Sequence, residues 1–438
     1  MKRLLYMLLL SLFASCQNFQ SKEPAGSTAN LTELEKEIRS TFSAVDSLLA
    51  IDHGGFWNKE VYGALLMVDP ESRVFYANEN NQEEAFNRIG AMYTDTLPPE
   101  INISNTAFNW GDKRWSMIML PLPEEKVARN HLVIHELFHR IQPDLGFTGI
   151  PEMDNGHLDT YEGRVQLKLE LQALEEAVLA TEPERRTKHI KNALAFRQKR
   201  QSSPDIKKAE NALELNEGLA EYTALKLSGR NEQEVKSQLI RSKNAFFSNP
   251  TFVRSFAYHT IPFYGYLLSE SKPRWHRDID IGTNLSDYFI HSFGVSVDDS
   301  QPIDQIADSG EYEYQKIVNE ETERERKRVE KAEKLRKKFT QHPVLDLPFQ
   351  NMNISFDPRN LTPLEGLGTI YPDLRVTDLW GTLTVKNDAL VSSDWSKVTV
   401  SAPNKVSADL VEGDGWQLEL AKGWMIEQHN GAYKIGKK

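Results

Sequence analysis

Residues 131–142, HLVIHELFHRIQ, hold the side chains of this chain whose types and spacing best suit catalysis. His135 and His139 are four positions apart, so on a helix their imidazoles would project from one face, about 5–6 Å apart. That spacing suits two ligands of one tetrahedral zinc ion. Glu136 follows His135, where its carboxylate could take a proton from metal-bound water and pass it to a leaving group. The segment has the HExxH pattern and predicts metal-assisted hydrolysis; two surface histidines beside a solvated glutamate are the alternative.

A catalytic zinc ion also needs a third protein ligand and an open position for water. Residues 216–222, NEGLAEY, lie in a helical pattern, and Glu217 could supply that ligand. However, Glu210, Glu214, Glu217 and Glu221 all fall on one side of a helical wheel, so a plain acidic surface is the alternative interpretation. Carboxylates stacked four residues apart repel one another, and a metal ion or nearby basic side chains must offset that repulsion.

These two motifs, in this order, resemble those of the gluzincins, the zinc peptidases that include thermolysin and the NEG-containing aminopeptidases. The resemblance implies that His135, His139 and Glu217 bind zinc and that Glu136 is the general base. It further implies that Glu221 orients a ligand histidine by accepting a hydrogen bond from it. The resemblance covers the two motif helices only, and the segment between them is longer than in most gluzincins.

Gluzincins usually supply a Tyr or His from a later helix to stabilise the developing oxyanion. Here the segment 256–268, FAYHTIPFYGYLL, offers Tyr258 and Tyr264 for that role, with buried core aromatics as the alternative. His131 would close the site if it were a fourth ligand, so we expect it to be structural or to line the substrate site. The strand WSMIML at 115–120 is expected to be the sheet edge to which a peptide substrate adds.

The periodicity of apolar residues predicts the elements that must position these groups. Two hairpin-like stretches, at about 63–78 and 105–120, indicate a small sheet ahead of the first motif. Thr32 is the expected N-cap of the first helix, and Asp159 followed by Glu162 indicates another helix start. His157, just before it, is expected to be structural, with a role in the site as the alternative. Helices are expected at about 31–49, 124–142, 159–181, 184–200, 205–228, 232–245 and 255–270.

Residues 311–340 include a dense run of mixed charge with a thin apolar stripe, which predicts a solvated helix with ion pairs between neighbouring turns. From residue 342 the pattern changes to short alternating strands separated by Pro, Gly, Asn and Asp. We therefore predict an α+β chain. A mainly helical, zincin-like metallopeptidase domain with a small N-terminal sheet is expected over 31–340, and a small β domain over 342–438.

The N-terminus has the build of an export signal. A basic segment at 1–3 and a short apolar run at 4–13 are followed by Ala-Ser and then by Cys16, the single cysteine of the chain. This order resembles a bacterial lipoprotein signal, although Phe13 stands where an aliphatic residue is preferred. The resemblance implies a signal peptide over 1–16, lipidation of Cys16 and a polar tether over 17–30. We expect a chain anchored by lipid in the cell envelope, at the outer membrane or cell surface and facing the periplasm or the exterior.

Composition narrows the range of partners. The 438 residues carry 52 basic and 63 acidic side chains and a formal net charge of −11, which argues against a nucleic-acid partner. The sequence therefore predicts a Zn²⁺-dependent peptidase acting on a peptide or protein substrate. Two alternatives stay open: a zinc hydrolase of another amide, and a non-catalytic zinc-binding or scaffolding lipoprotein.

Overall fold

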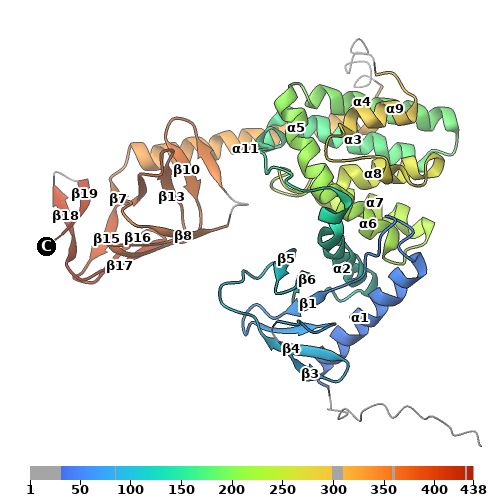
Figure 1. Ribbon diagram of the computed structural model, residues 1–438. Helices are drawn as coiled ribbons and strands as arrows, with labels where there is room; N and C mark the ends of the chain where they lie inside the picture. The colour runs from blue at the N-terminus through green and yellow to red at the C-terminus, as the bar shows by residue number, and fades with distance from the viewer. Residues whose placement is uncertain (1–30, 84, 298–308, 358–360, 430–431, 438) are drawn as a thin grey trace, which may run out of the picture.

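The computed structural model describes residues 31–83, 85–297, 309–357, 361–429 and 432–437, and it has an α+β fold (Figure 1). The leader, Cys16 and the tether lie outside the described residues, so the predictions about them stay predictions. Among the described residues, no helix is both long enough and apolar enough to span a membrane.

A six-stranded sheet forms the N-terminal part, in the order β3-β4-β2-β1-β6-β5. Strands β1 and β6 are parallel and the other neighbours are antiparallel. Because β6 pairs with β1 on one side and β5 on the other, the expectation that its segment is a sheet edge is wrong; β5 is the edge on that side. The bounds are β1 Leu65–Val68, β2 Val74–Ala77, β3 Asn87–Ile89, β4 Met92–Thr96, β5 Thr106–Trp110 and β6 Lys113–Met119.

Alternation along the central strands divides the apolar residues between the two faces of this sheet. On β1, Leu65 and Met67 join the main helical core, whereas Leu66 and Val68 join a smaller cluster with Trp115 on the other face. The helix that carries the HExxH motif, α2, packs on β6 and also on α6, and in Figure 1 it lies between the sheet and the upper helices α3, α4 and α8. The sheet therefore supports the motif helix along the side that packs on β6.

The helices between the sheet and residue 293 share one apolar core. The Thr32 side chain caps the first of them, as the sequence predicts, and the structure adds a capping box with Glu35. All seven expected helices are present, while the short α9 was not anticipated. The bounds are α1 Glu33–Asp52, α2 Lys126–Ile141, α3 Tyr161–Leu179, α4 Pro183–Arg200, α5 Pro204–Leu213, α6 Leu219–Leu227, α7 Glu232–Phe246, α8 Ala257–Ser271 and α9 Leu285–Phe293; a π-helical turn, Glu214–Gly218, joins α5 to α6.

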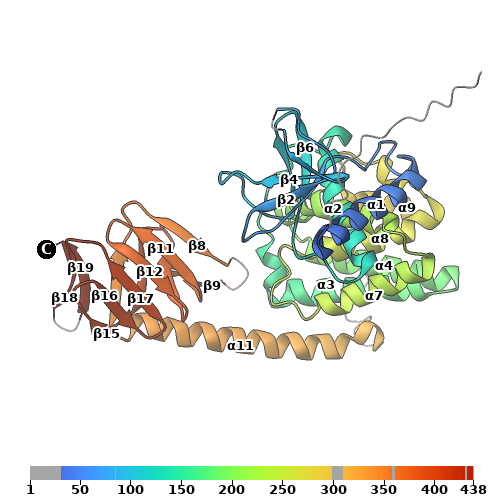
Figure 2. The same cartoon turned by 90° about the horizontal axis from the view of Figure 1, so that it is seen from below.

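A single long helix, α11 (Tyr314–Thr340), leads from the helical body to the C-terminal β region (Figure 2). Ile317 packs in the helical core and Leu335 and Phe339 pack against the β region, whereas Val329 between them is 43% exposed. Ion pairs such as Arg326–Glu330 and Arg328–Glu325 lie on its surface, so the prediction of a solvated helix with ion pairs between neighbouring turns is confirmed.

The C-terminal strands form two sheets that enclose their own apolar core, which includes Leu345, Val376, Trp380 and Val400. The strand orders are β18-β19-β7-β14-β13-β10-β9 and β15-β16-β17-β12-β11-β8. The bounds are β7 Val344–Pro348, β8 Asn353–Phe356, β9 Thr362–Leu364, β10 Gly368–Tyr371, β11 Leu374–Asp378, β12 Gly381–Val385, β13 Ala389–Ser392, β14 Lys397–Ser401, β15 Pro403–Val406, β16 Leu410–Gly413, β17 Trp416–Leu420, β18 Trp424–His429 and β19 Ala432–Lys437.

Candidate metal centre

Helix α2 holds both motif histidines in place through its apolar face. Ile134, Leu137, Phe138 and Ile141 are fully buried on the core side of the helix. The hydroxyl of Ser116 on β6 also donates a 2.9 Å hydrogen bond to the carbonyl of Glu136. Packing on one side and this backbone contact fix how α2 is rotated about its axis, and so fix where its histidines point.

Three side-chain atoms from two helical segments converge at one point. His135 Nε2 and His139 Nε2 are 3.2 Å apart, and each lies 3.3 Å from Glu217 Oε2. At the usual zinc–ligand distances of about 2.1 Å, the corners of a tetrahedron are about 3.4 Å apart. The residues His135, His139 and Glu217 could therefore hold a metal ion without rearrangement.

A chain of hydrogen-bonded side chains behind His135 places a hydrogen on its Nδ1. The guanidinium of Arg230 can only donate, so His131 Nδ1 accepts from it at 2.9 Å and His131 Nε2 donates to Glu221 Oε1 at 2.8 Å. The other oxygen of Glu221 lies 3.2 Å from His135 Nδ1 and accepts its hydrogen. His135 Nε2 is then free to face Glu217, as the orienting role expected of Glu221 requires.

Electrostatics favour a cation at the point of convergence. Burial opposes charge on His135, but contact with Glu217 and Glu221 outweighs burial and raises the histidine pKa to about 10. Burial alone would raise the pKa of both carboxyl groups, but His135 and His139 hold that of Glu217 well below its usual range, and His131 and His135 do the same for Glu221. The ionised carboxylate of Glu217 lies at the point of convergence and that of Glu221 lies behind His135, and a metal ion is one source of the positive charge that they attract.

Glu136 is 5% exposed, and its Oε2 has no hydrogen-bond partner among the described residues. Burial is the main cause that raises the pKa of its carboxyl group, and Glu217 adds to the rise, while His135 and His139 oppose it. A buried carboxyl oxygen without a partner is costly unless water or another ligand supplies one. The group thus has the spare hydrogen-bonding capacity of a proton acceptor.

The structure brings one of the two candidate tyrosines to this cluster. The Tyr258 hydroxyl donates a 2.5 Å hydrogen bond to Glu217 Oε2, and its ring stacks on that of His135 with centroids 5.3 Å apart. Burial and the adjacent Glu217 raise its pKa far above the usual value, so it remains a donor. Tyr264, in contrast, is fully buried and donates to Glu170 Oε1 at 2.8 Å, so it lies outside the cluster.

The backbone that carries Glu217 departs from a regular α-helix. Glu214–Gly218 form a π-helical turn, a feature that is frequent at functional sites. Its wider turn rotates the side chains after it relative to those before it. Glu217 and Glu221 contact histidines of α2. Glu210 and Glu214 pair with arginines of α4. At Gly218, a Cβ atom would collide with the side chain of Ile261 on α8. Only glycine allows this close approach of the turn to α8.

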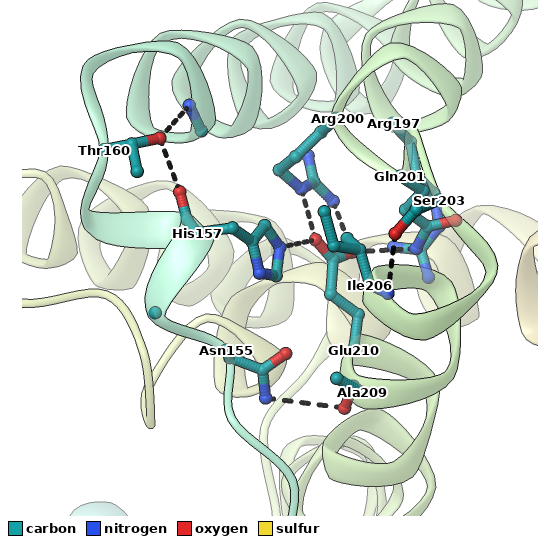
Figure 3. A network of polar contacts seen from close by, with 12 residues as sticks. Asn155, His157, Thr160, Arg197, Arg200, Gln201, Ser203, Ile206, Ala209 and Glu210 are labelled. Atoms are coloured by element: carbon teal, nitrogen blue, oxygen red, sulfur yellow. Dashed lines mark hydrogen bonds and ion pairs between the residues drawn. The ribbon is translucent and has the colours of Figure 1, made fainter.

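Glu210 and Glu214 have no exposed surface, which excludes the interpretation of an acidic surface face. Figure 3 shows Arg200 and His157 directed at the Glu210 carboxylate, at 2.7 Å each. Arg197 pairs with Glu214. The long segment between the motifs therefore supplies the cations that offset these carboxylates and hold the ligand-bearing turn in place.

A cavity of about 780 Å³ opens beside Glu217 and Tyr258. Helix α5 contributes apolar side chains to its lining, and charged side chains also line it. The lining residues are Ile150, Pro151, Glu152, Met153, Asp154, Asn155, Ala209, Ala212, Leu213, Asn216, Glu217, Val253, Arg254 and Tyr258. The volume is within the range of ligand-binding clefts.

Of the weaker sequence candidates, His131 lies in the chain behind His135 and is structural. His157 binds Glu210 rather than the cluster. Sequence reasoning missed Gln142, whose Oε1 lies 2.9 Å from His139 Nδ1, and Arg230, which supports His131. Gln142 is three residues beyond His139, and carrying the helical spacing one turn past the motif would have pointed to it.

Comparisons of this chain with protein-family models, with curated proteins and with solved structures find no match. The support for a metal centre therefore comes from the geometry of the site alone.

Proposed function

We propose that this chain is a zinc-dependent peptidase of the gluzincin type, which hydrolyses peptide bonds with Glu136 as general base. The observation that carries the proposal is the convergence of His135, His139 and Glu217 at tetrahedral spacing. Zinc is the favoured metal because two histidines and one glutamate are a ligand set that catalytic zinc ions use, with one position left for water.

The chemistry follows from what surrounds that point. When bound, zinc would act as a Lewis acid toward water and a substrate carbonyl. Glu136, with its raised pKa and unpartnered oxygen, is suited to take a proton from the attacking water and deliver it to the departing amine. Tyr258 is close enough to turn its hydroxyl from Glu217 to the oxygen of the attacked carbonyl. The adjoining cavity gives an extended peptide a place to lie.

Replacing Glu136 tests the proposal. In Glu136→Gln, zinc content should match the wild type, because Glu136 is not a ligand, but peptide hydrolysis should fall by about 10²–10⁴-fold, because an amide cannot accept the proton. The measurement is zinc stoichiometry alongside turnover of a peptide library. Glu162→Gln, at an exposed acid in the first turn of α3 and outside the cavity lining, is the matched control.

Wild-type turnover in Glu136→Gln would remove this residue from the mechanism. Activity on other amides but not on peptides would favour the broader class of zinc amidohydrolases. Zinc binding without turnover of any amide would instead favour a non-catalytic binding protein.

We also propose that Cys16 is lipidated and anchors the chain in the cell envelope, on the basis of the basic, apolar and Ala-Ser-Cys order at the N-terminus. Cys16→Ser should abolish incorporation of labelled fatty acid and move the chain from the membrane fraction to the soluble fraction. Unchanged membrane retention of this variant would rule out lipidation as the anchor.

A further inference from the structure

One buried amide side chain connects the two halves of the candidate metal centre. Gln142 directly follows α2 and is 5% exposed. Its Oε1 lies 2.9 Å from His139 Nδ1, and its Nε2 lies 3.2 Å from the carbonyl oxygens of both Leu215 and Asn216. These two carbonyls belong to the π-helical turn and immediately precede Glu217. A single side chain therefore contacts one candidate ligand and the backbone that carries another.

The direction of each hydrogen bond follows from the chemistry of the groups. Backbone carbonyls only accept, so the amide nitrogen of Gln142 must face Leu215 and Asn216, and its oxygen must face His139. An amide oxygen also only accepts, so His139 must donate from Nδ1. In a neutral imidazole the hydrogen on Nδ1 leaves a lone pair on Nε2, the atom that lies 3.3 Å from Glu217 Oε2.

His135 obtains the same tautomer from Glu221, which the family resemblance implies, whereas His139 obtains it from Gln142, to which the resemblance assigns no role. We propose that Gln142 is a positioning residue of the metal centre. It holds His139 in the tautomer and orientation that bind a metal, and it sets the distance between α2 and the turn that carries Glu217. This inference rests on the proposed metal site but not on peptidase activity.

Gln142 belongs to a longer chain of hydrogen bonds between the candidate ligands. Asn216, whose carbonyl accepts from Gln142, also donates from its own amide to Glu217 Oε1 at 3.0 Å. Thus Gln142, Asn216 and Glu217 form a continuous path from one candidate ligand to another. Removal of Gln142 would take one hydrogen bond from each of the two carbonyls and one from the His139 imidazole at the same time.

The test is zinc affinity of the full chain, measured by competition with a chromophoric chelator. Gln142→Met keeps most of the buried volume but makes no such hydrogen bonds, and Gln142→Asn keeps the amide on a stem too short to reach both partners. Both variants should bind zinc about 10–100-fold more weakly than the wild type, which is the usual effect of losing a group that orients a ligand. With Co²⁺ in place of zinc, both should also show an altered visible spectrum.

Gln166→Met is the matched control, since Gln166 is a buried glutamine on α3 outside the cluster. The melting temperature of the metal-free chains separates positioning from general stability, because a purely structural role would lower that temperature without changing zinc affinity. Zinc affinity within about twofold of the wild type in a folded Gln142 variant would overturn the inference. If the wild-type chain itself bound no zinc, the proposed function would fail instead, so the two failures are distinguishable.

Discussion

The imidazole of His276 shows how strongly surroundings control a single titratable group in this chain. It stacks on Phe56 with ring centroids 4.1 Å apart, and its Nε2 donates to the carbonyl of Phe56 at 2.8 Å. Its Nδ1 has no partner among the described residues. Burial lowers the pKa of His276 to about 4, because the nearby Asp278 offsets it only in part, whereas contact with two carboxylates raises the pKa of His135 to about 10.

This difference predicts an acid sensitivity of the fold. His276 is neutral in the folded chain down to about pH 4, while in the unfolded chain it takes a proton near its ordinary pKa of 6.5. The unfolded chain therefore binds more protons between these values, and stability should fall as the pH drops from 6.5 to 4. At about 1.4 kcal/mol per pKa unit, His276 alone accounts for a loss on the order of 3 kcal/mol.

Denaturant unfolding at a series of pH values measures this loss. His276→Phe keeps an aromatic ring on Phe56, and the Phe56 carbonyl keeps its 2.8 Å hydrogen bond from Arg277 Nε. The variant should therefore have a flatter stability profile between pH 6.5 and 4. Replacement of the exposed His342 by Gln is the control. An unchanged slope in His276→Phe would contradict the assignment of this sensitivity to His276.

At the scale of elements, regular periodicity was sufficient to predict the helices that carry the site. The predicted helices at 124–142 and 205–228 contain both motifs, and their positions are confirmed by α2 and by the α5–α6 segment. The π-helical turn inside the second segment was not predicted, because a helical wheel assumes one constant angle per residue. That assumption placed four glutamates on one face, whereas in the structure Glu210 and Glu214 pair with arginines of α4 and Glu217 contacts the histidines of α2.

Helix ends depended on contacts that are distant in sequence. Asp159 was expected to cap α3, but the cap is Thr160, whose side chain accepts from the backbone of Gly163. Asp159 instead accepts a 2.8 Å hydrogen bond from the backbone of Phe252. Tyr264 was likewise misplaced because its partner, Glu170, lies on another helix of the bundle. Local spacing identifies a residue that suits a role, but tertiary packing selects which residue takes it.

At the scale of the whole molecule, the long segment between the two motifs is part of the site's support. Arg200 pairs with Glu170 on α3 and with Glu210 beside the π-helical turn, and all three side chains are fully buried. Helix α11 is anchored to the same body, because Glu321 binds Arg164 and Lys168 of α3. The buried ion pairs thus connect the segment between the motifs, the ligand-bearing turn and the helix that leads to the C-terminal sheets.

Zinc titration of three chains tests the central claim most directly. The wild type should bind one zinc ion per chain. Glu217→Ala leaves two protein ligands, so zinc binding should no longer be measurable. Glu221→Ala keeps all three ligands and should weaken zinc affinity by about 10–100-fold. If Glu221→Ala proved the more damaging of the two, the ligand and orienting roles would be reversed. If neither change altered zinc affinity, the account of this cluster as a metal centre would be contradicted.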